Sequence, residues 1–116
     1  MKVKIVTIEQ SQVKARSNFD QNQEIETFDV LALIGEVQYL FRMSIDIDVV
    51  ADRQIQIINA DTHFQDFFKF NLELDRAISK LVSKVYNNEP VELPIIVGEF
   101  NSAEIEPYPR PVRIST

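Results

Sequence analysis

Residues 37–49 alternate between apolar and mostly polar side chains, and this pattern limits the possible fold more than any other in the chain. At 44–48 the run Ser-Ile-Asp-Ile-Asp alternates strictly and includes β-branched side chains. A helix needs apolar side chains every three or four positions, whereas a half-buried strand needs them at every second position. β-branched residues also favour strands. The pattern therefore predicts a long strand over residues 36–50 with one apolar face.

The segments on either side of this strand suggest an antiparallel meander. Residues 24–34 fit either a strand or a helix, and we favour a strand, with Gly35 forming a bulge or a bend before the long strand. Residues 54–60 predict the next strand, and a three-residue loop over 51–53 would place Ile55 opposite Val49 and keep the apolar side chains on one face. Residues 68–74 alternate again and predict a third strand.

A helix is expected over residues 76–87. Asp75 suits its N-terminus, and Pro90 follows its end. The apolar positions have helical spacing and give a stripe that can pack on a sheet: Ile78, Leu81, Val82 and Val85. Two further strands are expected at residues 2–9 and 91–100, and Pro94 suggests that the second lies at a sheet edge or carries a bulge. The polar residues 10–23 predict a loop or arm without packed structure.

The expected fold class is α+β: an antiparallel meander of long strands, one helix (about 76–87) packed on one face, and extended termini. With 116 residues, the chain is expected to form a single domain over residues 1–100. Residues 101–116 are expected to form an extended C-terminal arm, because Pro107, Pro109 and Pro111 favour a polyproline-like backbone.

The composition argues against several classes of partner. A net charge of −6 does not suit a broad contact with a nucleic-acid backbone, so we expect no nucleic-acid partner. We expect no membrane partner either, because no segment is apolar over the length of a spanning helix. The N-terminus lacks the unbroken apolar run of a signal peptide, which leads us to expect a soluble, cytoplasmic protein.

Few residues could carry out catalysis, and we expect neither a catalytic residue nor a cofactor. The chain has no cysteine and two glycines, which excludes a thiolate site and a glycine-rich phosphate loop. His63 is the single histidine, and its phenylalanine neighbours favour a place beside a hydrophobic cluster over a role as general base. Asp46, Asp48 and Asp52 could offer oxygens to Mg²⁺ or Ca²⁺, but a solvated strand face is the better interpretation, so we predict no metal.

Two features point to a protein partner. The second face of the predicted sheet includes apolar residues that one helix cannot cover, so either the first strand, folded back, or another subunit must cover them. The C-terminal arm carries an aromatic residue and two arginines that could lie across an acidic neighbour. The candidate partner-binding residues are Leu40, Ile58, Phe67, Tyr108, Arg110 and Arg113.

These features favour a non-catalytic, homo-oligomeric structural, assembly or adaptor protein. Small viral or phage assembly components share long strands, arms and a lack of catalytic residues, and such a protein would be found in the virion. One alternative is a monomeric acidic inhibitor or immunity-type protein that occupies a basic site on its target. A second is a carboxylate-dependent metal enzyme built on the three aspartates.

Overall fold

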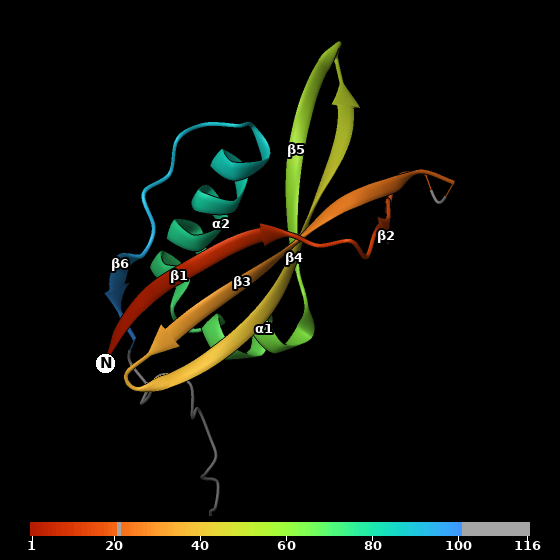
Figure 1. The fold of residues 1–116 in the computed structure, drawn as a ribbon. Coiled ribbons are helices and arrows are strands. Elements are labelled where there is room, and N and C mark those ends of the chain that lie inside the picture. The colour runs from red at the N-terminus through yellow and green to blue at the C-terminus, as the bar shows by residue number, and fades with distance from the viewer. Residues whose placement is uncertain (21, 101–116) are drawn as a thin grey trace, which may run out of the picture.

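The computed structural model describes residues 1–20 and 22–100, and shows a mixed α+β fold in which an antiparallel sheet dominates (Figure 1). The strands run in the order β5-β4-β3-β1-β6, with β2 paired to β3 beyond the end of β1. The strands are β1 (Lys2–Gln10), β2 (Ala15–Arg16), β3 (Glu24–Ile34), β4 (Val37–Val50), β5 (Arg53–Ala60) and β6 (Ile95–Glu99). The helices are α1 (Thr62–Phe68) and α2 (Leu72–Tyr86).

The long strand and its neighbour at 24–34 are confirmed. They form the β3–β4 hairpin, in which Ile34 pairs with Val37. Gly35 lies in the turn with a φ of 63°, a backbone conformation that glycine adopts without steric cost. It is therefore a bend rather than a bulge. The expected strand at 91–100 is present as β6, and it lies at the sheet edge, as Pro94 predicted.

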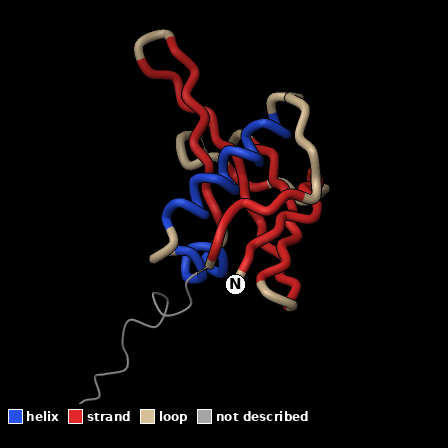
Figure 2. The backbone as a smooth tube through the Cα atoms, turned by 90° about the vertical axis from the view of Figure 1, so that its left-hand side faces the viewer, coloured by secondary structure: helices blue, strands red, loops and turns tan. Residues whose placement is uncertain are grey.

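Both helices cover the same face of the sheet (Figure 2). The predicted stripe of α2 is confirmed, because Ile78 and Val82 are buried in the core cluster. Phe41 of β4 lies at the centre of an aromatic group, with ring centroids 5.4 Å from Phe64 and 5.5 Å from Phe68. The core therefore forms between the odd-numbered residues of β4 and the apolar sides of both helices.

The predicted strand at 68–74 is wrong, because α1 and the first turn of α2 occupy this stretch. Phe64 and Phe68 are four positions apart and both buried, which is a helical spacing, whereas Phe70 is exposed. Asp61 starts α1 by accepting the Phe64 N–H at 2.8 Å. The second helix begins at Leu72, earlier than expected, so Asp75 lies in its first turn rather than at its cap.

The predicted register of the β4–β5 hairpin is also wrong by one residue. Val49 pairs with Gln54, and Ile55 pairs with Asp48. A two-residue turn, with φ of 52° at Ala51 and 65° at Asp52, replaces the expected three-residue loop. The mixed faces that this register produces cost little, because this part of the hairpin projects beyond the body of the molecule (Figure 1).

Within the segment expected to be a loop, residues 10–20 and 22–23 are more ordered than predicted. The β2 segment pairs with β3, and the side chain of Thr27 donates to the carbonyl of Val13. Ser17 is buried and donates from Oγ to Asp46 Oδ1 at 2.8 Å. The strand expected at 2–9 is confirmed as β1, which lies inside the sheet between β3 and β6, so the N-terminus is part of the sheet and not an extension of it. Neither described helix has the length and apolar character that a membrane crossing requires.

Candidate interaction surface

The face of the sheet opposite the helices carries a group of four apolar and two polar residues that we call the open face: Leu31, Leu33, Leu40, Ile96, Lys4 and Thr7. Strand pairing places these residues on one side, because paired residues point the same way. Leu31 pairs with Leu40 and with Thr7, while Lys4 pairs with Leu33 and with Ile96. Each alternates along its strand with residues that face the core.

The open face is apolar and accessible. The exposed fraction is 58% for Leu40 and 52% for Ile96, while Leu31 and Leu33 are half-buried by their neighbours in the sheet. None of these four residues belongs to the core cluster or packs against it. One edge of the face is closed by an ion pair, in which Arg42 Nε lies 3.0 Å from Asp29 Oδ1.

The far end of the same side is covered by residues 11–18, which we call the cover segment. Asp46 is 1% exposed, and its carboxylate accepts the Ser17 hydroxyl and the Asn18 N–H, each at 2.8 Å. Thr27 is buried under the same segment. The chain therefore covers part of its second face with its own N-terminal region, and the open face is the part that this segment does not reach.

The cover segment is held at its start by a charged group. Lys14 Nζ lies 2.5 Å from Glu26 Oε2, and Gln10 donates to the other carboxylate oxygen. The hydrogen bond from Lys14 is the main cause that lowers the pKa of Glu26, and the bond from Gln10 adds to it. This group fastens the chain that follows β1 to β3.

The end of the β4–β5 hairpin, residues 48–55, forms a second accessible apolar element that we call the hairpin tip. Val49, Val50 and Ile55 are all exposed. On the side that continues the open face, Asp48 pairs with Ile55, and Val50 pairs with Arg53. The last contacts with the body lie below the tip, where Gln56 Oε1 accepts the Ser83 hydroxyl at 2.9 Å. The tip is thus a two-stranded ribbon without support from the core.

The structure separates the predicted partner-binding residues. Leu40 lies on the second face, as expected. The placement of Ile58 and Phe67 on that face is wrong: Ile58 pairs with buried Ile45, and Phe67 belongs to α1, where its ring lies 4.7 Å from Tyr39. The cause is the register error in one case and the unpredicted helix in the other. Three further candidates lie outside the described residues: Tyr108, Arg110 and Arg113.

The three aspartates considered for a metal do not act together. Asp46 is buried under the cover segment, whereas Asp52 lies in the exposed turn of the hairpin tip. Among residues 1–20 and 22–100, no three acidic or histidine side chains gather closely enough to hold an ion. His63 is exposed at the edge of the aromatic group, 5.0 Å from Phe41 between ring centroids.

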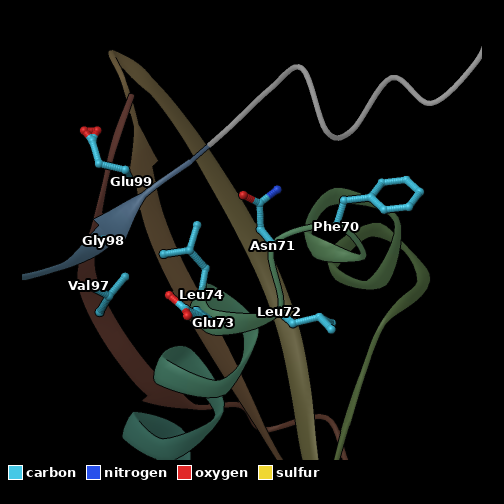
Figure 3. Close-up of a pocket in the computed structure, with 8 residues that line it drawn as sticks. All are labelled: Phe70, Asn71, Leu72, Glu73, Leu74, Val97, Gly98 and Glu99. Atoms are coloured by element: carbon cyan, nitrogen blue, oxygen red, sulfur yellow. The ribbon is translucent and has the colours of Figure 1, made fainter.

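A depression of about 270 Å³ lies between the start of α2 and β6 (Figure 3). Leu74 and Val97 line its inner part, while the ring of Phe70 points away from β6 (Figure 3). Glu73 and Glu99 are its charged residues, and none of its lining residues is basic. An anion at the helix N-terminus would therefore meet two carboxylates, which disfavours binding there.

Sequence reasoning missed Lys4 and Ile96 as members of the second face and the hairpin tip as a separate element. The adjacent apolar pair Ile95-Ile96 is the available signal, because neighbouring residues of an edge strand point to opposite faces. Comparison of the chain with family models, curated proteins and solved structures finds no significant match.

Proposed function

We propose that this chain is a non-catalytic structural or adaptor protein that assembles with copies of itself. The observation that carries this proposal is the open face, an apolar surface on a sheet whose other face already holds both helices. The exposed hairpin tip adds a second apolar surface to the same molecule.

The physical argument rests on the exposed area. Isolated apolar side chains are common on protein surfaces, but contiguous apolar patches mark sites of interaction. Leu40 and Ile96 are each about half exposed, and they flank two more leucines on the same face. Removing the exposed parts of these two side chains from water contributes about 2 kcal/mol per copy. A further contribution would come from the tip.

The test is the mass in solution, measured by light scattering after size exclusion over a range of concentrations. We expect a discrete oligomer that Leu40→Gln weakens. Leu72→Gln is the matched control, because Leu72 is 56% exposed against 58% for Leu40 but lies on α2, away from the open face. A version of the chain ending at Glu106 tests whether the C-terminal arm takes part in the assembly.

A monomer at every concentration would contradict the proposal and favour the alternative of a monomeric inhibitor. Equal loss of assembly in both leucine variants would also count against it, because the effect would then not depend on the open face. Thermal unfolding of each variant, followed by circular dichroism, separates a loss of assembly from a loss of fold.

A further inference from the structure

We propose that the open face of one copy binds the hairpin tip of a second copy, with Lys4 paired to Asp48 across the contact. This inference rests on the proposed function and names the two surfaces that would meet. The two surfaces lie on different parts of the molecule, one on β1, β3, β4 and β6, and the other at the end of β4 and β5.

The open face offers one cation among apolar side chains. Lys4 lies between Leu33 on β3 and Ile96 on β6, its two pairing partners. The ion pairs found among the described residues do not include Lys4, although they include Lys2, Lys14 and Arg42. A partner that suits this surface has apolar side chains around one carboxylate.

The hairpin tip has this pattern. On one side of the ribbon, the carboxylate of Asp48 lies opposite Ile55, and Val50 follows two positions later, opposite Arg53 at the start of β5. Asp48 accepts the N–H of its neighbour Val49 at 2.8 Å and takes part in no ion pair among the described residues. Asp48 with its apolar neighbours Ile55 and Val50 therefore matches Lys4 and the leucines of the open face, while Arg53 lies nearer the turn on this side of the ribbon.

The tip cannot reach the open face of its own chain. Leu40 and Val50 lie ten residues apart on the same strand, which corresponds to about 34 Å along β4. The cover segment, anchored on Asp46, also lies between them on that side of the sheet. The hairpin tip of a second copy can reach the open face, because it is not joined to that face by the length of β4.

Charge reversal provides the test. Lys4→Glu and Asp48→Lys are each expected to raise the dissociation constant of the assembly about tenfold or more, because each places like charges in contact. The double variant Lys4→Glu/Asp48→Lys is expected to recover most of the wild-type affinity, since it restores the pair with reversed sign. Glu89→Lys supplies a matched control with the same change of charge at an exposed position after α2.

By itself, Glu89→Lys is expected to leave the dissociation constant unchanged. Combined with Lys4→Glu, it is expected to restore none of the lost affinity. Single reversals without effect, or a double variant as weak as the singles, would overturn the named contact while leaving self-assembly intact. A wild-type chain that is monomeric at all concentrations would overturn both proposals, so the two failures are distinguishable.

Discussion

Asp46→Ala tests the idea that the cover segment is held by one buried carboxylate. The substitution removes the carboxylate that accepts hydrogen bonds from Ser17 and Asn18. These two bonds link β4 to a segment that lies almost thirty residues earlier in the chain. It also leaves the Ser17 hydroxyl, which is 2% exposed, without the carboxylate that it contacts. The covering contact over this end of the sheet should therefore weaken.

The magnitude follows from these bonds. A hydrogen bond to a charged group contributes about 1.5–3 kcal/mol, so the two bonds give about 3–6 kcal/mol. Part of this gain is offset in the wild type by the cost of burying the carboxylate, which alanine does not incur. We therefore expect a loss of about 3 kcal/mol in the free energy of unfolding. Asp46→Asn keeps the shape and one acceptor oxygen, and should lose roughly half as much.

The assay is urea denaturation followed by circular dichroism, with Asp48→Ala as the control. Asp48 lies two residues further along the same strand and accepts only the N–H of Val49 in the described structure, so its loss should change the stability of the isolated chain by less than about 0.5 kcal/mol. Equal stabilities for the two alanine variants would refute the reasoning, because the burial of Asp46 and its bonds to the cover segment would then contribute nothing to the free energy of unfolding. Amide exchange at Asn18 should accelerate in Asp46→Ala alone.

Three other expectations follow from the packing, the charges and the turn. Phe41→Ala removes the fully buried centre of the aromatic group and should cost about 3–5 kcal/mol in denaturant titration, whereas Leu40→Ala, on the open face, should cost far less in the isolated chain. Glu26 has a folded-state pKa below its usual 4.5, so its contribution of under about 1 kcal/mol is present above that pH and fades as the pH falls below it; Glu26→Gln should flatten this part of a stability profile measured from pH 7 to 3, and salt should weaken the effect. Ala51→Gly relieves a left-handed backbone and should raise the free energy of unfolding, measured by urea denaturation, by about 0.5–1 kcal/mol.

The elements that the sequence predicts correctly are those with a single periodicity. The strict alternation at 44–48 admits only a strand, and the stripe of Ile78 and Val82 admits only a helix. Residues 68–74 carry two conflicting signals, because alternation along Phe68 and Phe70 coexists with the helical pair Phe64 and Phe68. The decisive local signal is Asp61, whose side chain caps α1.

The candidate surface is less predictable, because it depends on contacts between distant residues. Asp46 occupies a position that alternation assigns to solvent, and it is buried by a segment that begins far earlier in the chain. The sequence does show that Leu31 and Leu33 point away from the core-facing Val30, Ala32 and Ile34, since this strand is apolar on both sides. The register of the β4–β5 hairpin cannot be predicted from the sequence. It depends on the left-handed conformation of Ala51 and Asp52, which neither residue type strongly favours.

The position of β1 between β3 and β6 has a consequence for biosynthesis. Lys2 pairs with Glu99, and the Phe100 N–H donates to the Met1 carbonyl at 2.6 Å, so the two sides of this contact are made almost a hundred residues apart. Contacts of such high sequence separation slow folding. Until β6 leaves the ribosome, one edge of β1 remains open for pairing with another nascent chain. Translation that stalls before residue 95 should therefore yield fragments that aggregate.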